Sequence, residues 1–330
     1  MIRRSLTLFI AALALACSSS TNHDPRAPDT SPRTRYSGLE VGASTVGAIP
    51  DVLLRDNERN KDITLSVDYP TRGGPHPLIV LSPAGVLTNR EYVGLSSYWA
   101  ANDYVVIRVA HPDARGDRAR DLRFVLDSLD ALEQRYPELQ GKIDRTRIGA
   151  AGHEEGGQTA MELAADPRIK AVIAMAPSGG PEVKGPTLFI VPAPVPPPVQ
   201  PGTTTAAAVA PSEAPPPEVF ARMPAGDKWA VIIEGARFQS FTGRLDDVTR
   251  AQARARANTG DPFNPNDNVM TRDGRVVNRA DYAAIRQQDL FAIVRGSALA
   301  FWDAYLKSDA AGRTALEKLG DRRGTTLERK

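Results

Sequence analysis

The chain has little of what a disulfide-stapled or nucleic-acid-binding protein needs. Cys17 is its only cysteine, so no disulfide can form within one chain. Lysine and arginine number 41 against 39 for aspartate and glutamate, and neither sign gathers into a dense block. A nucleic-acid partner is therefore not expected. The apolar run over residues 6–16 is too short to span a bilayer.

That apolar run has the layout of a secretory signal. Arg3 and Arg4 precede it and Cys17 follows it, so we predict a signal peptide over residues 1–16. Residues 13–17 resemble a bacterial lipobox, which implies cleavage before Cys17 and lipid attachment there, giving a membrane anchor. Ser18 rather than an aspartate at the next position favours the outer membrane, as the resemblance to lipoproteins implies. The alternative is an ordinary signal peptide and a secreted protein.

Three segments are predicted to lie outside the folded domain or to be exposed on it. Residues 17–36 are rich in Ser, Thr, Pro, Asn and Asp without an apolar period, so we predict a lipidated flexible tether. Residues 192–217 alternate proline with Ala, Val, Thr and Ser, which predicts an exposed, extended insertion. One role for this insertion is to bind a protein that recognises proline-rich sequence, and the simpler role is that of a solvated spacer. Residues 321–330 are predicted to form a polar tail.

Between these segments, short β-branched runs alternate with amphipathic helical stretches. This order predicts an α/β fold with a mostly parallel sheet and helices on both faces, as one domain over residues 37–320. Continuous apolar runs indicate central strands, and an apolar spacing of three and four indicates helices that lie on the sheet. The expected strands are 63–69, 78–81, 104–107, 147–150, 171–175, 187–191 and 229–233, and the expected helices are 91–101, 122–132, 161–165 and 290–305.

The most informative motif runs from Gly152 to Gly157, with the sequence Gly-His-Glu-Glu-Gly-Gly. Its small residues and its place between a strand and a helix predict a nucleophile elbow, the sharp turn that presents an attacking serine. Glu154 stands where that serine belongs.

Further motifs make the chain similar to the dienelactone hydrolase and platelet-activating-factor acetylhydrolase-like branch of the α/β-hydrolases, which also includes bacterial polyester hydrolases. The resemblance covers roughly residues 39–316 and implies the α/β-hydrolase fold. Its specific parts are Leu-Ser-Pro-Ala-Gly at 81–85, Arg-Phe-Val-Leu-Asp at 123–127, Ile-Asp-Arg-Thr-Arg-Ile-Gly at 143–149, Phe-Thr-Gly at 241–243 and Ala-Phe-Trp-Asp-Ala-Tyr-Leu at 300–306.

The resemblance implies a serine, an aspartate and a histidine at set places, and this chain departs from all three. Glu154 takes the serine position. The aspartate is expected just after residues 188–191, but proline-rich sequence begins there and no carboxylate occurs before Glu213. The histidine position falls on Phe238, and no histidine follows His153. Acyl transfer by a triad needs an oriented histidine as base. No residue is therefore assigned with confidence as catalytic.

The remaining histidines are few. His23 lies in the tether, His76 in a loop before a strand, and His153 next to the elbow; for these three and for His111, a structural role is favoured. His111 follows a strand and would be the only candidate for a relocated base. Related folds use an aspartate at the elbow as nucleophile, so altered chemistry through Glu154, with His111 as base, stays open as the alternative.

The candidate binding pocket consists of Gly85, Val86, Glu154, Glu155 and Phe238. The family implies oxyanion donors from the backbone of Glu155 and of Gly85 or Val86. A helix N-terminus favours an anion, so we expect Glu154 to be ionised and to fold over these donors.

Adjacent Glu154 and Glu155 lack an accompanying ligand cluster, so no metal site and no cofactor are predicted. Asp246 and Asp247 are read as a helix cap and a solvated charge.

These observations favour a catalytically inactive, lipid-anchored member of the hydrolase fold, a pseudoenzyme. Its expected partner is a small acyl or ester-like ligand or a protein of the bacterial cell envelope. The alternative is an ester or other hydrolase that uses Glu154 in altered chemistry.

Overall fold

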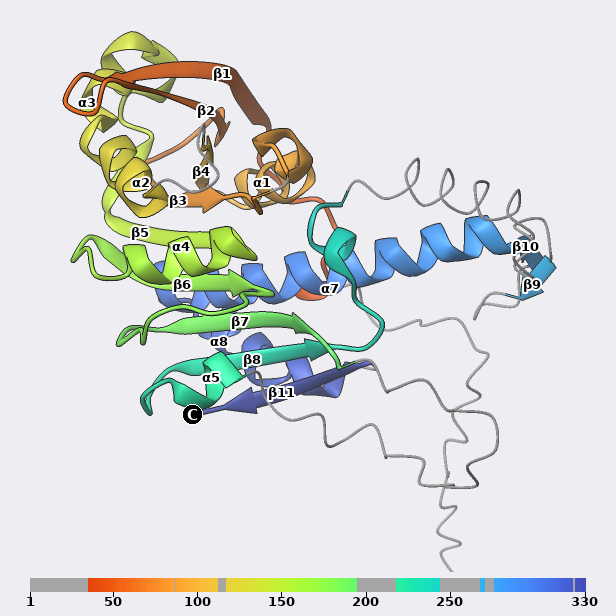
Figure 1. The fold of residues 1–330 in the computed structure, drawn as a ribbon. Helices are drawn as coiled ribbons and strands as arrows, with labels where there is room; N and C mark the ends of the chain where they lie inside the picture. The colour runs from red at the N-terminus through yellow and green to blue at the C-terminus, as the bar shows by residue number, and fades with distance from the viewer. Residues whose placement is uncertain are drawn as a thin grey trace, which may run out of the picture.

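The structure is a computed structural model that describes residues 35–85, 87–111, 117–194, 218–243, 268–270, 276–322 and 324–330. Its centre is one twisted sheet with helices on both faces (Figure 1). The strand order is β1-β2-β4-β3-β5-β6-β7-β8-β11. Neighbours from β4 to β8 run parallel, while the β1–β2, β2–β4 and β8–β11 pairs are antiparallel.

The strands of this sheet are mostly short, and the central ones are buried. Their bounds are β1 Val46–Asp56, β2 Lys61–Pro70, β3 His76–Ser82, β4 Val105–Ala110, β5 Ile143–His153, β6 Ile169–Met175, β7 Thr187–Pro192, β8 Lys228–Ile233 and β11 Thr325–Arg329. A separate two-stranded ribbon pairs β9 Asn268–Met270 with β10 Val276–Asn278.

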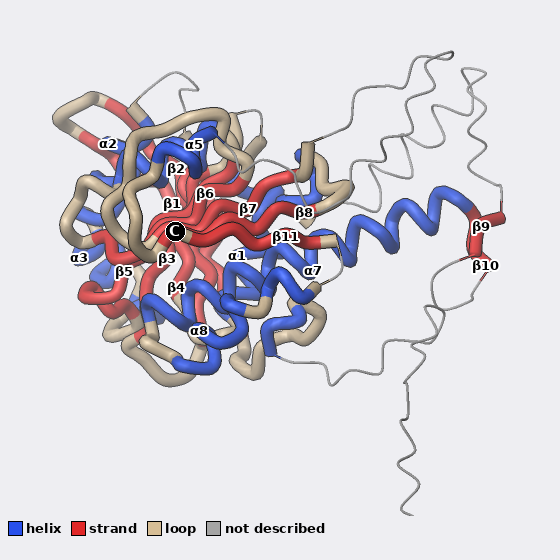
Figure 2. The backbone as a smooth tube through the Cα atoms, turned by 90° about the horizontal axis from the view of Figure 1, so that it is seen from below, coloured by secondary structure: helices blue, strands red, loops and turns tan. Residues whose placement is uncertain are grey.

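The helices divide between two hydrophobic layers. One layer holds α2 Arg118–Asp127, α3 Leu129–Arg135, α4 Glu155–Leu163 and α5 Glu218–Arg222. The other holds α1 Val93–Ala100, α7 Arg279–Leu306 and α8 Ala310–Glu317. Figure 2 shows α7 and α8 on the side of the sheet opposite to α2 and α5. Strand residues alternate between the layers, since Leu78 and Val80 belong to the first and Ile79 and Leu81 to the second. Short 3-10 helices at Arg35–Ser37, Asn89–Tyr92, Pro137–Leu139, Phe238–Phe241 and Leu319–Asp321 complete the elements.

The predicted α/β-hydrolase fold is confirmed, and each strand expected from the sequence is present. The expected helix over 122–132 is interrupted at Ser128, which separates α2 from α3. The Ser128 hydroxyl donates to the carbonyl oxygen of Phe124 at 2.7 Å. Such bonding of a serine back to the preceding turn competes with the regular helix, which explains the interruption.

Both ends of the predicted domain need correction. Residues 321–330 are not a free tail, because Thr325–Arg329 form β11 and pair with β8. The tether does not reach residue 36, because Arg35 and Tyr36 bind the buried Asp303 of α7 at 3.0 and 3.1 Å. Neither contact could be predicted from the sequence, because both segments are rich in polar and charged residues and show no apolar period.

Several sequence predictions lie outside the described residues: the signal peptide, Cys17, the tether over 17–34, residues 195–217 of the proline-rich insertion, and Asp246 with Asp247. Within the described ranges, no helix combines the length and the apolar character that crossing a membrane requires.

Candidate functional site

The elbow predicted from the sequence lies between β5 and α4, with Glu154 at the turn. Glu154 has φ of 50° and ψ of −113°, a backbone conformation that is costly for a residue with a side chain. Its N–H donates to the carbonyl of Met175 at 2.8 Å, and its carbonyl accepts from Gln158 at 3.0 Å. These bonds to β6 and α4 hold the strained turn in place.

Glycine is required on both sides of this turn. A Cβ atom on Gly152 would lie 1.9 Å from the carbonyl oxygen of Gly156. A Cβ on Gly156 would lie 2.1 Å from the carbonyl oxygen of Ser82, the last residue of β3. The elbow therefore packs backbone against backbone, and β3 ends directly beside it.

The pKa of Glu154 shifts in the direction that opposes the expected ionisation. Burial and the neighbouring charge of Glu155 raise the pKa of Glu154, which is opposite to the lowering that a helix N-terminus alone would cause. The desolvation of a half-buried carboxylate and the repulsion between adjacent carboxylates outweigh the helix dipole here. Ionisation of Glu154 is thus disfavoured by its surroundings.

The backbone N–H of Gly85, an expected oxyanion donor, binds the side chain of Glu155 and not that of Glu154. The N–H of Gly85 donates to Oε2 of Glu155 at 2.9 Å. This bond is the main reason that the pKa of the Glu155 carboxyl is lowered, and the charge of Arg118 adds to it. The expectation that Glu154 covers the donors is therefore wrong, because Glu155, at the first position of α4, reaches across to the β3 loop. Val86 lies outside the described residues.

His153 is packed among aromatic rings beside the elbow. Its ring is fully buried, and its Nδ1 lies 2.8 Å from the Tyr92 hydroxyl. Phe238 and Phe241 lie against it, with ring centroids 4.8 and 4.9 Å away. Burial lowers the pKa of His153 to about 4, so the ring is neutral at neutral pH. Phe238, at the position where the family resemblance implies a histidine, thus makes an apolar contact.

The place expected for the aspartate is the end of β7. There Pro192 ends the strand and Ala193 and Pro194 follow it, and none of these described residues carries a carboxylate. His76, expected in a loop, is instead the first residue of β3, where its Nε2 lies 3.1 Å from the carbonyl oxygen of Arg72. The backbone of His76 pairs with Ile143 at the start of β5, and this pairing extends β3 to the histidine.

His111 has one partner on each ring nitrogen, and neither partner is Glu154. Its Nε2 lies 2.8 Å from the Oγ of Ser82, and its Nδ1 lies 3.0 Å from Oδ2 of Asp121. Both ring nitrogens are therefore engaged. The idea of His111 as a relocated base for Glu154 receives no support from this geometry.

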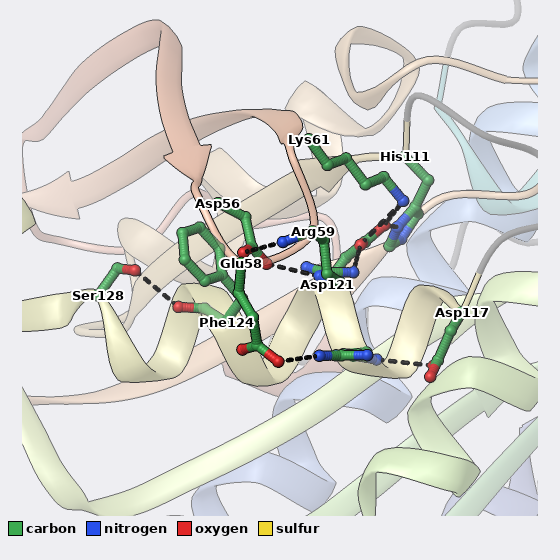
Figure 3. Close-up of polar contacts among 10 residues, drawn as sticks. Asp56, Glu58, Arg59, Lys61, His111, Asp117, Asp121, Phe124 and Ser128 are labelled. Atoms are coloured by element: carbon green, nitrogen blue, oxygen red, sulfur yellow. Dashed lines mark hydrogen bonds and ion pairs between the residues drawn. The ribbon is translucent and has the colours of Figure 1, made fainter.

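Asp121, in the first turns of α2, is the centre of this polar cluster. Figure 3 shows Arg59, Lys61 and His111 converging on its carboxylate. Arg59 Nη1 and Lys61 Nζ lie 2.6 and 3.0 Å from its Oδ1. Burial opposes ionisation of Asp121, but the hydrogen bonds from His111, Arg59 and Lys61 prevail and lower its pKa to about 2.

Sequence reasoning missed the alignment of Ser82, His111 and Asp121. The only available signal was that Ser82 ends one apolar run and His111 follows the next. Their proximity depends on β3 and β4 being parallel neighbours, with Leu81 opposite Arg108. Among the residues that the structure describes, no group of three or more His, Cys, Asp or Glu side chains has the arrangement of a metal site.

Comparison with known proteins points to the same fold. A family model described as PET hydrolase-like matches residues 65–209, which include Ser82, His111, Asp121 and Glu154 but end before Phe238. A bis(hydroxyethyl) terephthalate hydrolase of Streptomyces coelicolor is 30% identical over 138 residues, 38% of this chain and 42% of that protein.

Two cutinases show similar levels of identity. Cutinase est1 of Thermobifida alba is 28% identical over 116 residues, 34% of this chain and 38% of its own length. Cutinase 2 of Thermobifida cellulosilytica is 27% identical over 133 residues, 38% of this chain and 50% of its own length. The chain thus aligns with half or less of each relative. These similarities support a hydrolase-family protein with the fold of the α/β-hydrolase superfamily.

Proposed function

We propose that this protein binds a small carboxylic ester or acyl compound at the elbow without hydrolysing it there, as a pseudoenzyme. The observation that carries the proposal is the hydrogen bond from Gly85 N–H to the Glu155 carboxylate. A carboxylate on this donor occupies the place where an ester carbonyl would be polarised. Glu154 at the turn and Phe238 against His153 supply neither the serine nor the histidine of a triad.

The ligand class follows from the relatives, whose names describe hydrolases of a terephthalate ester and cutinases. A site that descends from such enzymes keeps a pocket for an ester even when its reacting groups change. Altered chemistry at Glu154 is the weaker alternative. Both ring nitrogens of His111 are bound, to Ser82 and Asp121, so the histidine that this chemistry would use as a base has other partners.

The first test is steady-state hydrolysis of p-nitrophenyl acetate by the purified protein and by Glu154→Ala. We expect no turnover above the uncatalysed rate in either protein. Continuous turnover that is lost in Glu154→Ala would show that the elbow carboxylate is chemically engaged and would refute the proposal.

The second test measures binding. An ester that binds the folded state raises the thermal midpoint, and the stabilisation grows with the logarithm of the ester concentration divided by its Kd. Glu155→Ala frees the Gly85 N–H for the ester carbonyl, so we expect about a tenfold gain in affinity, the effect of one hydrogen bond. Glu162→Ala is the matched control, because Glu162 lies on the same helix and contacts Gln158 instead. Equal affinity for all three proteins would argue against an occupied donor at Gly85.

We further propose that Cys17 carries the lipid anchor and that the protein resides in the bacterial cell envelope. The lipobox-like residues 13–17 support this localisation. Metabolic labelling with a palmitate analogue should mark the protein but not Cys17→Ser. Labelling of neither protein would favour the secreted alternative, and labelling of both would show that the lipid is not on Cys17. An envelope protein as partner of residues 192–217 is a separate proposal, supported only by their proline-rich sequence.

A further inference from the structure

We propose that Ser82 is an activated nucleophile, with His111 as general base and Asp121 as orienting carboxylate, that accepts an acyl group from a small activated ester. This site is distinct from the elbow. It lies one strand along the sheet, on the layer that faces α2, and the proposal goes beyond ester binding at Glu154.

The two distances are those of a nucleophile–base–orienter array. Ser82 Oγ lies 2.8 Å from His111 Nε2, and His111 Nδ1 lies 3.0 Å from Asp121 Oδ2. Because an ionised carboxylate only accepts hydrogen bonds, Nδ1 carries the ring proton of the neutral histidine. The lone pair on Nε2 then faces the Ser82 hydroxyl, which donates to it. This is the tautomer that removes a proton from a serine.

The surroundings keep His111 neutral and Asp121 ionised, as a general base and an orienting carboxylate require. Burial lowers the pKa of His111, against the effect of Asp121, so its ring is neutral and basic at neutral pH. Lys61 and Arg118 reinforce this lowering. Asp121 stays ionised because Arg59 and Lys61 also bind it. The array is therefore poised to react and not merely hydrogen-bonded.

A cation is also available for the charge that develops on the ester oxygen. Arg118 is 7% exposed and donates from Nη1 to the carbonyl oxygen of Pro83, the residue after Ser82, at 3.1 Å. Its Nε is buried and has no hydrogen-bond partner among the described residues. The bond to Pro83 holds this guanidinium next to the residue that follows Ser82, and an unpaired N–H of a guanidinium is a suitable donor to an oxyanion.

The reaction balances without a further reagent. The Ser82 oxygen forms a bond to the ester carbonyl carbon while its proton passes to Nε2 of His111. The carbon–oxygen bond to the alcohol or phenol then breaks, and the same proton passes to that leaving oxygen. Ser82 has no exposed surface, so a small ester reaches it only during a transient opening, and the acyl group is closed off from water again once that opening ends. We therefore expect one acylation per chain and no turnover.

The test is acetylation of the full-length protein by p-nitrophenyl acetate, followed by intact mass measurement and peptide mapping. We expect a stoichiometric burst of p-nitrophenol and one acetyl group on Ser82. His111→Ala should slow this acetylation roughly 100-fold, the usual contribution of a general base. Because the pKa of His111 is lowered, the burst rate should hold through about pH 6.5 and fall only at lower pH, where His111 takes up a proton.

Ser96→Ala is the matched control. Ser96 is equally buried and donates to a buried carboxylate, Asp68, at 2.6 Å, but it has no histidine. Its removal should leave the burst unchanged. Acetyl groups on surface lysines alone, or equal labelling of Ser82 and Ser96, would overturn the proposal.

The mapping uses the unmodified chain, so it stands even if a variant fails to fold. It also separates the two proposals. An unlabelled Ser82 with no turnover refutes only this inference, whereas turnover that depends on Glu154 refutes only the proposed function.

Discussion

Single residues at the elbow depart from the pattern of the resemblance, while the backbone around them keeps the form that pattern requires. Glu154 adopts the positive φ of an elbow, and Gly152 and Gly156 leave no room for side chains. Glu155 then fills the Gly85 donor. The replacement of the serine by Glu154 is evident from the sequence. The identity of the carboxylate that reaches Gly85 is not, because adjacent residues on a turn point in different directions.

At the same scale, His153 should make stability depend on pH. Its pKa of about 4 lies below the usual 6.5, so folding favours the neutral ring. The resulting stability is fully present above pH 6.5 and is lost as the pH falls toward 4. The difference corresponds to about 3 kcal/mol in the free energy of unfolding. Urea unfolding of the parent chain and His153→Asn at pH 7.5 and pH 4.5 checks this. The variant should lose clearly less stability on acidification, and parallel losses would assign the effect to other groups such as His111.

Among the elements, strands with continuous apolar character could be read directly, whereas strands at the sheet edges could not. β3, β4 and β6 are buried on both faces and appear as apolar runs. β1 alternates buried and exposed side chains, and the side chains of β11 are only partly buried. Both strands are held in the sheet by their backbone pairing with β2 and β8. Edge strands depend on a neighbour's hydrogen bonds more than on their own hydrophobicity, so the sequence gives a weak signal for them.

The contact between α4 and β3 leads to a prediction at this scale. Gly156→Ala places a methyl group against the Ser82 carbonyl, and a backbone shift must follow. We expect a loss of at least about 2 kcal/mol in the free energy of unfolding. Gly179→Ala is the control, since a Cβ there meets nothing within 4 Å, and it should change stability by less than about 0.5 kcal/mol. Denaturant unfolding of both variants measures the difference, and similar values would contradict the close approach of α4 to β3.

Over the whole molecule, the buried Asp303 joins distant parts of the chain. It accepts from Arg35 and Tyr36 near the start of the described chain, from Tyr104 just before β4, and it pairs with Lys307 at the end of α7. Such a carboxylate fixes the position of the first residues against α7. Its role is invisible in the sequence because its partners lie up to 268 residues away.

Removal of this charge should therefore weaken the whole fold. Asp303→Asn leaves the cations and hydroxyls around it under-satisfied, and we expect a loss of about 3 kcal/mol in the free energy of unfolding. Asp62→Asn breaks the exposed Arg55–Asp62 pair instead and should cost less than about 1 kcal/mol. Thermal and urea unfolding distinguish the two. Equal effects would show that Asp303 acts as an ordinary surface charge.

The sequence by itself determined the alternation of strands and helices, the elbow at Glu154, and the lack of any histidine after His153, because hydrophobic period and residue identity are local properties. Only the tertiary structure decided that Glu155 meets Gly85 and that Ser82, His111 and Asp121 align. Those contacts arise from the parallel pairing of β3 with β4 and from the packing of α2 and α4 on the sheet. Strand order and helix packing are set by the sum of many distant contacts, and no single segment of sequence contains them.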